Sequence, residues 1–287
     1  MSIMLNSVNQ SLHTYRNNST ASSDSIRKIA SGSKYPGAAY GPASYAILQR
    51  TYSRIGAVQQ ANANAQNSNA MLSTAAAAAG NTVDMLSSLR SNILEAANGT
   101  NAGSDLSALQ KSVDQTIAGL DDNVASATYN GMRLLDGSKT TTVQSVDGYT
   151  NIQLGDLTSQ GLGLTDNSGK STINLTDTSS LGDALDKVDS ALNKALDQAT
   201  TLGAAQQGLN YQSANLTTQQ ENLLASASTD GDTDIAAEAT KKATSDTLGQ
   251  TALWAIKQGL QNFNQQTMGT LGGINNHSRG AALKMLM

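Results

Sequence analysis

The chain has 287 residues, a net charge of −4 and only 3% aromatic residues. Its apolar fraction is 38%, against roughly 45–50% in ordinary globular domains, so a thick core is hard to build. Thin apolar seams between paired helices need far fewer large side chains. The absence of cysteine excludes disulfides, thiolate nucleophiles and cysteine-based metal sites.

Charge is unevenly spread along the chain. Residues 1–60 carry six basic residues and one acidic one, whereas residues 146–235 carry three basic and twelve acidic ones. The two segments either pair with each other or present separate solvated faces. The N-terminus lacks the features of a secretory signal and no run of about 18 apolar residues occurs, so we expect no membrane insertion, and either an intracellular protein or a dedicated exporter.

Residues 1–31 are predicted to form the first helix, which carries one stripe at alternating steps of four and three residues. The stripe consists of Val8, Leu12, Tyr15, Ser19, Ser22, Ile26 and Ile29. Its central serines weaken it as an apolar seam. A connector rich in aromatic residues and proline follows, with Tyr35, Pro36, Tyr40 and Pro42, because the residue before a proline avoids the helical region.

A second helix is predicted from Ala43 to about Asn98 and a third from Ser104 to about Val124. The second contains no internal proline and ends where Gly99 supplies a stop. The third closes at residues 129–131, which read Tyr-Asn-Gly. A helical hairpin folded back on the long helix is the expected result.

Residues 134–180 have a different character and are predicted to form a small solvent-facing insert rich in β-structure. Asp136-Gly137 and Asp147-Gly148 are turn signals. Residues 141–146, 150–154 and 171–175 alternate in polarity or carry β-branched residues, which favours short strands.

Helical periodicity returns from Leu181 to about residue 225, with leucines at seven-residue steps through Leu209, Leu216 and Leu223. Residues 226–234 are predicted to form a break. The last helix carries Leu253, Ile256, Leu260 and Phe263, and residues 269–273 are predicted to form a hinge before the tail 274–287.

The predicted fold is mainly α, with long terminal coiled-coil helices and an antiparallel helical bundle that bears a small insert rich in β-hairpins. We predict three domains: residues 1–42 with 236–287, residues 43–133 with 181–235, and residues 134–180. When the two halves of a helical domain lie at opposite ends of a chain, the simplest packing places the N- and C-terminal helices side by side. Apolar seams on these helices are then available for contact with neighbouring subunits.

Sites for catalysis, metals and cofactors are not apparent in the sequence. His13 and His277 lack helix-spaced ligand partners. The adjacent residues Asp121 and Asp122 point in different directions on a helix, so we interpret them as a solvated face. We therefore predict that the protein is not an enzyme and binds no cofactor and no metal. We also predict no binding of nucleic acid, because the chain is acidic and lacks the aromatic or glycine-rich motifs that recognise nucleic acids.

The chain resembles bacterial flagellin over nearly its whole length. The most specific motifs lie in residues 98–101 (Asn-Gly-Thr-Asn), 104–106 (Ser-Asp-Leu), 109–110 (Leu-Gln) and 129–131 (Tyr-Asn-Gly). Residues 29–32, 61–67, 152–164, 202–206 (Leu-Gly-Ala-Ala-Gln) and 234–238 (Asp-Ile-Ala-Ala-Glu) are similar to further family motifs in matching order.

The resemblance implies a secreted subunit, carried out by the flagellar export apparatus with a chaperone, that polymerises into the extracellular filament of the bacterial flagellum used for motility. It also implies that cap and junction proteins are partners. The residues expected to pack in the filament are Val8, Leu12, Tyr15, Ile26, Ile29, Leu253, Ile256, Leu260 and Phe263.

Three features depart from the family pattern. Residues 39–44 replace an acidic connector motif, so Tyr35, Pro36, Tyr40 and Pro42 are expected to substitute for it. Ser88, Asn92 and Ser112 match positions where the family carries the Arg, Leu and Glu that an innate flagellin receptor reads, which argues against recognition by that receptor. A C-terminal tail extends past Gly272.

Three alternatives remain open at this point. A hook-filament junction protein shares the terminal helices but occurs in few copies. A filament for adhesion or a surface coat has no role in motility. A filament-linked enzyme needs a catalytic insert, and the short insert here lacks a His-Glu-x-x-His pattern.

Overall fold

The computed structural model describes residues 2–138, 140–144 and 149–284, with side chains described for residues 6–138 and 151–269. Two compact units divide the chain: unit 1 combines residues 1–52 with 224–287, and unit 2 comprises residues 53–223. The long helices α2 (Pro42–Ala96) and α5 (Leu181–Gly231) contribute to both units. The division into three domains remains a prediction.

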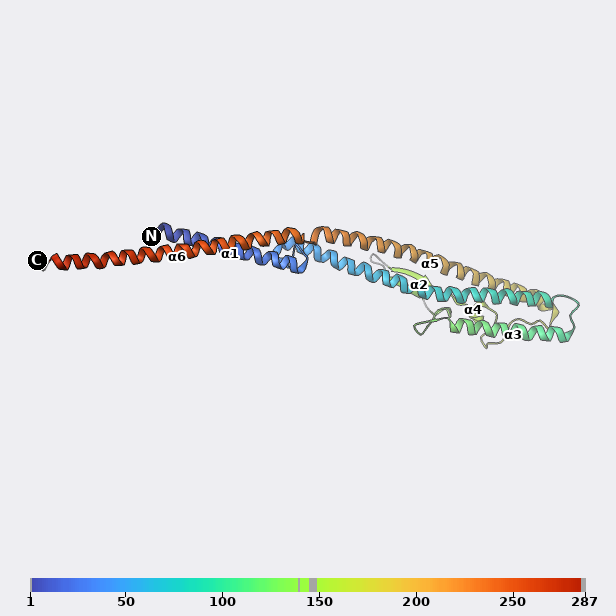
Figure 1. Cartoon of the computed structure of the whole chain (residues 1–287). Coiled ribbons are helices and arrows are strands. Elements are labelled where there is room, and N and C mark those ends of the chain that lie inside the picture. The colour runs from blue at the N-terminus through green and yellow to red at the C-terminus, as the bar shows by residue number, and fades with distance from the viewer. Residues whose placement is uncertain (1, 139, 145–148, 285–287) are drawn as a thin grey trace. The chain divides into compact units, whose positions relative to one another are not determined.

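Unit 1 is built on two helices from opposite ends of the chain. Helix α1 (Ser2–Ser31) lies beside α6 (Ile235–Lys284), and the two run antiparallel (Figure 1). The 3-10 turn η1 (Ala38–Tyr40) lies between α1 and the start of α2. Asp234 caps α6, since its Oδ1 accepts a hydrogen bond from the Ala237 backbone N at 3.0 Å.

Two predicted interruptions of these helices are wrong. The break after residue 225 is confined to Asp232–Asp234, because α5 continues to Gly231. The hinge at residues 269–273 does not form, because α6 continues to Lys284. Glycine costs about 1 kcal/mol inside a helix relative to alanine, but it removes no backbone hydrogen bond, so it weakens a helix without ending it.

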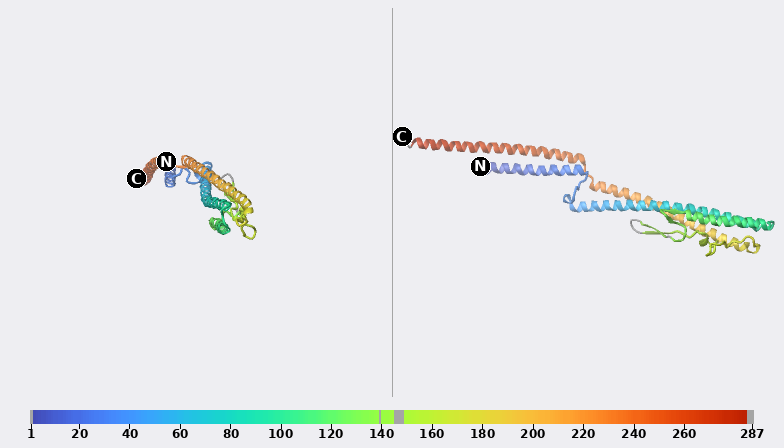
Figure 2. Two further views of the ribbon diagram at one scale, coloured as in Figure 1. Left: turned by 90° about the vertical axis from the view of Figure 1, so that its right-hand side faces the viewer. Right: turned by 90° about the horizontal axis from the view of Figure 1, so that it is seen from below.

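Unit 2 packs α3 (Gly103–Ser126) and the insert against parts of α2 and α5 (Figure 2). A continuous apolar core joins these elements, with the side chains of Leu72, Leu86, Ile93, Leu120 and Leu202 among those almost completely buried. A second, smaller cluster of Val58, Ala61 and Leu216 lies between α2 and α5. The seven-residue steps of the leucines in α5 predicted this burial.

Two small antiparallel hairpins form, one directly before the insert and one within it. Strands β1 (Thr128–Tyr129) and β2 (Met132–Arg133) pair across Asn130 and Gly131, whose positive φ angles of 49° and 74° suit a two-residue turn. Strands β3 (Thr140–Gln144) and β4 (Tyr149–Gln153) pair as the sequence predicted. The turn predicted at residues 147–148 lies outside the described residues.

The predicted strand at residues 171–175 is absent from the part of the chain that the structure describes, where Ser171 makes only an isolated bridge with Thr165. This segment is a loop because a side chain of α3 takes up its backbone groups. The short helix α4 (Ser159–Leu162) and the 3-10 turn η2 (Thr178–Ser180) flank it. Buried leucines of the insert, including Leu135 and Leu164, belong to the core of unit 2.

Candidate assembly surface

The seam between α1 and α6 contains many small side chains. Residues that face the partner recur every three and four positions on both helices, the pattern of a two-stranded coil. On α1 they are Val8, Ser11, Tyr15, Asn18, Ser22, Ser25 and Ile29, and on α6 they include Glu238, Ser245, Gly249, Ala252, Ile256, Gly259 and Phe263. A Cβ placed on Gly259 would lie 2.6 Å from Val8 Cγ2, so the two helices approach too closely there for a side chain.

Hydrogen bonds from serines hold the middle of this seam. The Ser22 hydroxyl donates to Asp246 Oδ1 at 2.6 Å and the Ser25 hydroxyl donates to Glu238 Oε2 at 2.9 Å. Both serines are buried, and Glu238 is only 6% exposed. The stripe predicted from the sequence contained Ser22 but treated it as a weak point, whereas buried hydroxyls with charged acceptors stabilise a contact.

Lysine side chains contact both of these carboxylates, Glu238 and Asp246. Lys241 Nζ donates to Glu238 Oε1 at 2.8 Å, and Lys28 Nζ lies 3.6 Å from the same oxygen. The Lys241 hydrogen bond lowers the pKa of Glu238, with further lowering by Ser25 and Lys28, although burial opposes the shift. Lys242 and then Ser22 lower the pKa of Asp246 in the same way.

The residues predicted to pack in the filament fall into two groups within unit 1. Five are half-buried at the α1–α6 seam: Val8, Tyr15, Ile29, Ile256 and Phe263. The other four are exposed: Leu12 by 37%, Ile26 by 47%, Leu253 by 39% and Leu260 by 50%. The packing of all nine between subunits stays a prediction.

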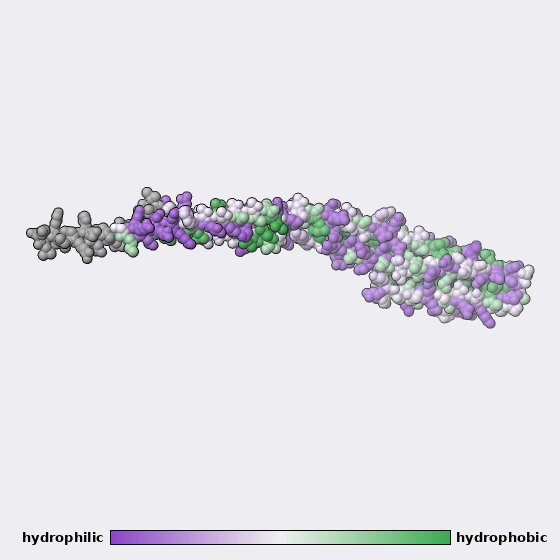
Figure 3. Space-filling view, viewed as in Figure 1, coloured by the Kyte–Doolittle hydropathy of each residue, from purple (hydrophilic) through white to green (hydrophobic). Residues whose placement is uncertain are grey.

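The four exposed side chains lie on one flank of the helix pair, which we call the apolar flank (Leu12, Ile26, Leu253 and Leu260). Each follows a seam position by one residue, and in an antiparallel pair such flanking positions of both helices line the same side. A groove of about 320 Å³ beside Ser19, Asp246 and Leu253 opens along this flank. Green apolar patches interrupt the purple polar surface of the helix pair in Figure 3.

The opposite flank is charged. Lys28 and Lys241 lie there around Glu238, beside a second groove that Asp24 and Thr244 also line. The apolar flank carries four large apolar side chains beside the Asp246–Lys242 pair, whereas the opposite flank carries Lys28 and Lys241 around Glu238. The two sides of the helix pair therefore present different chemistry to a neighbour.

The connector is tied down by its own polar contacts. The Tyr40 hydroxyl donates to Asp24 Oδ1 at 2.9 Å and accepts from Arg27 Nη1 at 3.0 Å. Lys34 Nζ donates to the Thr229 carbonyl at 2.8 Å, and Ser33 pairs with Asp232. The connector is therefore held against both α1 and the turn between α5 and α6.

The remaining connector residues shape the backbone. Gly41 has a φ of 143°, and a Cβ there would lie 3.1 Å from the Tyr35 ring, so the position requires glycine. Tyr35 and Pro36 are half-buried, and the exposed Pro42 begins α2, where its missing N–H has no cost. Whether these residues replace the family's acidic connector in an assembly stays a prediction.

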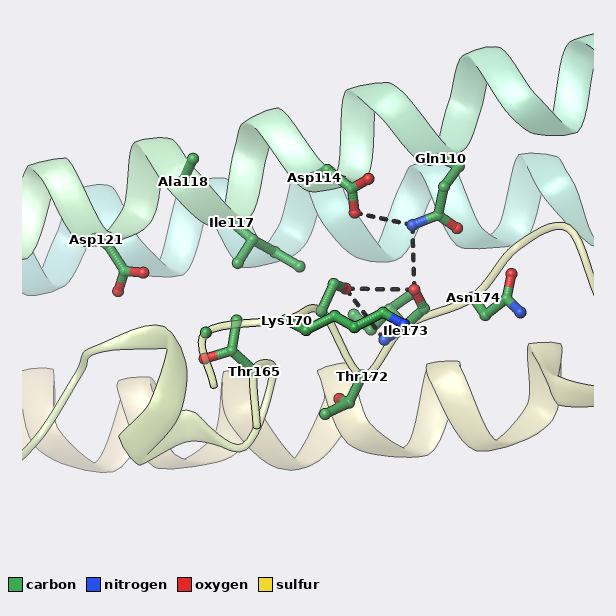
Figure 4. Close-up of a pocket in the computed structure, with 12 residues that line it drawn as sticks. Gln110, Asp114, Ile117, Ala118, Asp121, Thr165, Lys170, Thr172, Ile173 and Asn174 are labelled. Atoms are coloured by element: carbon green, nitrogen blue, oxygen red, sulfur yellow. Dashed lines mark hydrogen bonds between the residues drawn. The ribbon is translucent and has the colours of Figure 1, made fainter. Parts of the chain in front are cut away.

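In unit 2, Gln110 holds the insert against α3 (Figure 4). Its Nε2 donates to the Ile173 carbonyl at 3.1 Å and to Asp114 Oδ1 at 2.9 Å, while its Oε1 accepts from the Leu175 backbone N at 2.7 Å. Gln110, Asp114 and Ile173 line an open groove of about 590 Å³. The Gln110 amide thus hydrogen-bonds to backbone groups of residues 173 and 175 that would pair with a neighbouring strand if this segment were a strand.

Asp121 has a role that the sequence did not suggest. Its Oδ1 accepts from the Ser159 backbone N at 2.8 Å and its Oδ2 accepts from the Ser159 hydroxyl at 2.7 Å. The half-buried Asp121 therefore positions the start of α4, whereas Asp122 is exposed as predicted. The two carboxylates do not act together.

Repeated turns also stabilise the insert, and only the one at Asp136-Gly137 was predicted from the sequence. In five of them an Asp or Asn Oδ1 accepts from both the backbone N and the hydroxyl of the residue two positions later. The pairs are Asp136–Ser138, Asp156–Thr158, Asp166–Ser168, Asn174–Thr176 and Asp177–Ser179. The repeated pattern Asp/Asn-x-Ser/Thr is the sequence signal that predicts such turns. These contacts lower the pKa of Asp136, Asp166 and Asp177, with the Ser hydroxyl as the main cause in each.

Other candidate positions have ordinary environments. Asn92 Nδ2 donates to the Ser112 hydroxyl at 3.2 Å, so two of the three receptor-matching positions contact each other. His13 is exposed. Among the described residues, no group of three potential metal-ligating side chains was found, and no described helix has the length and apolarity that a membrane span requires.

Comparison with known proteins supplies the family. Residues 4–140 match the bacterial flagellin N-terminal helical region, and residues 185–270 match the bacterial flagellin C-terminal helical region. The chain belongs to the bacterial flagellin family. Family membership makes it a structural subunit of the flagellar filament, an extracellular assembly.

Similar proteins agree with this assignment. The flagellar filament 33 kDa core protein of Treponema phagedenis is 28% identical over 78% of the chain and 84% of its own length. The flagellin of Bacillus subtilis is 27% identical over 87% of the chain and 93% of its own length. A putative flagellar hook-associated protein from Vibrio parahaemolyticus shares the fold, with a TM-score of 0.56 at 16% identity over 67% of the chain and 99% of that structure.

Proposed function

We propose that the chain polymerises through unit 1, with the apolar flank of one subunit packing against a neighbouring copy. The observation that supports this most is the exposure of Leu12, Ile26, Leu253 and Leu260 along one side of a single helix pair. Exposed apolar surface of this kind is favourable to bury, by about 25 cal/mol for each Å² removed from water.

The seam explains why these four apolar side chains remain available for contacts between subunits. Small residues and serine hydrogen bonds close the contact between α1 and α6, so the large apolar side chains at positions 12, 26, 253 and 260 are not used within the subunit. A homopolymer supplies the missing partner, since each copy brings the same flank.

The assignment to a filament, and not to a hook-filament junction, is supported by the sequence relatives. The matched relatives of Treponema phagedenis and Bacillus subtilis are named as a filament core protein and a flagellin. The hook-associated protein is similar in fold alone. We further propose that the export apparatus, a chaperone, and the cap and junction proteins are its partners, and that the filament is used for motility.

Charged substitutions on the apolar flank test the proposal. Leu12→Asp and Leu260→Asp place a carboxylate in an interface without a partner, which is strongly unfavourable. We expect each to raise the critical concentration for polymerisation by about tenfold or more, as measured by sedimentation and electron microscopy after heat dissociation and reseeding.

Matched controls place the same charge on neighbouring exposed polar positions. His13→Asp and Gln261→Asp change the net charge without touching the apolar flank. We expect polymerisation close to that of the unmodified chain and an unchanged circular dichroism spectrum. Normal polymerisation of both Leu12→Asp and Leu260→Asp would show that the apolar flank is not the assembly surface.

A further inference from the structure

The apolar pattern of unit 1 leaves the register of α1 on α6 weakly specified. Seam positions repeat every seven residues on both helices, so a seven-residue slip again places seam positions opposite seam positions. Half of the seam side chains named above are small, among them Ser11, Gly249, Ala252 and Gly259. Gly259 is specific to one register, because a Cβ there would lie 2.6 Å from Val8 Cγ2. The other small residues fit against many partners, so their packing distinguishes poorly between registers.

The serine–carboxylate bonds are specific to one register. A slip of seven residues moves the contact of Asn18 from Gly249 to Ile256 and that of Ser25 from Glu238 to Ser245. It also puts Ile29 in the place of Ser22 beside Asp246. Both hydrogen bonds from serine are then lost, and a carboxylate faces an apolar side chain. The loss affects charge-assisted bonds, which are among the stronger hydrogen bonds in proteins.

The two bonds also lie on opposite flanks of the seam. Ser22 reaches Asp246 on the apolar flank, whereas Ser25 reaches Glu238 on the side of Lys28 and Lys241. A rotation of α1 that shortens one bond lengthens the other. The pair of bonds therefore fixes both the position and the rotation of α1 on α6.

We propose that Ser22 and Ser25 are positioning residues that select the register of the α1–α6 pair. The proposal goes beyond the proposed function because it concerns contacts within one subunit. Its consequence is that the register sets where Leu12 and Ile26 of α1 lie along the apolar flank relative to Leu253 and Leu260 of α6.

A second anchor lies at one end of the pair. Ser33 and Asp232 form an antiparallel bridge, and the Thr233 backbone N donates to the Gly32 carbonyl at 2.9 Å. This anchor follows α1, and Ser22 lies about 15 Å away from it along the helix at 1.5 Å per residue. A test must separate selection by the serines from selection by this backbone bridge.

The absence of cysteine makes register directly measurable by disulfide formation. A Cβ built on Gly249 lies 3.9 Å from Asn18 Cβ, within the range of about 3.5–4.5 Å that a disulfide requires. Asn18→Cys with Gly249→Cys therefore reports the observed register, and Asn18→Cys with Ile256→Cys reports a slip of one heptad. Both pairs are oxidised in the full-length chain, with and without Ser22→Ala and Ser25→Ala.

In the background with both serines, we expect the observed-register disulfide to exceed the slipped one by about tenfold or more. Ser22→Ala with Ser25→Ala is expected to lower that ratio about tenfold. Ser19→Ala with Ser23→Ala is the matched control, because it removes two exposed hydroxyls from the same helix, and the ratio is expected to stay unchanged.

Three results would overturn the proposal. An unchanged ratio in the Ser22→Ala, Ser25→Ala chain would assign the register to the backbone bridge. An equal fall of both disulfides would mean that the serines stabilise the pair without selecting its register. Absence of the observed-register disulfide in the background with both serines would refute the register itself. Sedimentation of the same chains tests assembly separately, so a chain that keeps its register but never polymerises counts only against the proposed function.

Discussion

Unit 1 and unit 2 use opposite ways to hold helices together. In unit 2, large leucines such as Leu72 and Leu86 are completely buried and form one continuous core. In unit 1, the buried positions of α1 are serines, and large apolar side chains stay exposed, among them Leu12, Ile26, Leu253 and Leu260. The difference leads us to expect that unit 2 is stable by itself, and the proposed function assigns the exposed apolar surface of unit 1 to contacts with other copies of the chain.

A core truncation should separate the two units most clearly. Leu135→Ala removes a fully buried side chain of unit 2 and is expected to lower the free energy of unfolding by about 2–5 kcal/mol. Leu260→Ala, in unit 1, is the control, with an expected change within about 0.5 kcal/mol. Urea unfolding followed by circular dichroism measures both, and equal losses would remove the distinction between the units.

The next largest loss of stability is expected from a substitution at the contact between the insert and α3. Gln110→Ala leaves the Leu175 N–H without its acceptor and the Ile173 carbonyl with the Ser171 hydroxyl at 3.3 Å as its remaining donor. We expect a loss of about 1–3 kcal/mol in unit 2. Limited proteolysis should show faster cleavage within residues 165–180. Gln115→Ala, an exposed position on the same helix, should change neither quantity, and an equal effect of both substitutions would argue against the docking role of Gln110.

Acid should weaken the seam of unit 1 in a way that depends on Glu238. Its pKa is lowered in the folded protein, so its contribution is complete above the pKa of an unfolded glutamate and is lost as pH falls through the lower, folded value. We expect faster hydrogen exchange of α1 amides below about pH 4, after correction for intrinsic rates.

Glu238→Gln should weaken protection of α1 at neutral pH and flatten its response to acid, because the group no longer titrates. Glu221→Gln, at an exposed position, should leave the response as it is. An unchanged acid response in the Glu238→Gln chain would mean that other groups control the seam.

The smallest change in the free energy of unfolding is expected from removal of a surface ion pair. Arg90 Nε lies 2.6 Å from Asp189 Oδ1, but both side chains are more than 40% exposed. Arg90→Ala is therefore expected to cost less than about 1 kcal/mol in urea unfolding, and the cost should vanish at 1 M salt. A larger loss that persists in high salt would show that this pair contributes to unit 2 as a packed contact.

The sequence predicted the helices well because apolar side chains recur on them at helical spacing. The stripe of α3, with Leu106, Val113, Ile117, Leu120 and Val124, is buried as the periodicity indicated. The mainly α fold was predicted from the same spacing. The hairpin of β3 and β4 was predicted from strand-like segments on either side of a turn signal, since local patterns determine local structure.

The seam of unit 1 was harder to predict because its central residues are not apolar. Periodicity favours Leu12 and Ile26, yet the buried neighbours are Ser22 and Ser25, whose acceptors lie more than 200 residues away in sequence. Only the fold brings those carboxylates into reach. The loop at residues 171–175 was missed for a similar reason, since Gln110 satisfies its backbone from another element.

Hydrogen exchange before and after polymerisation tests the central distinction most directly. We expect amides of α1 and of residues 238–263 to gain strong protection in the filament, because the apolar flank becomes buried there. Amides of the unit 2 core, such as residues 72–93 and 184–209, should already be protected in the dispersed chain and change little. Unchanged protection in unit 1, or a gain confined to unit 2, would contradict the account.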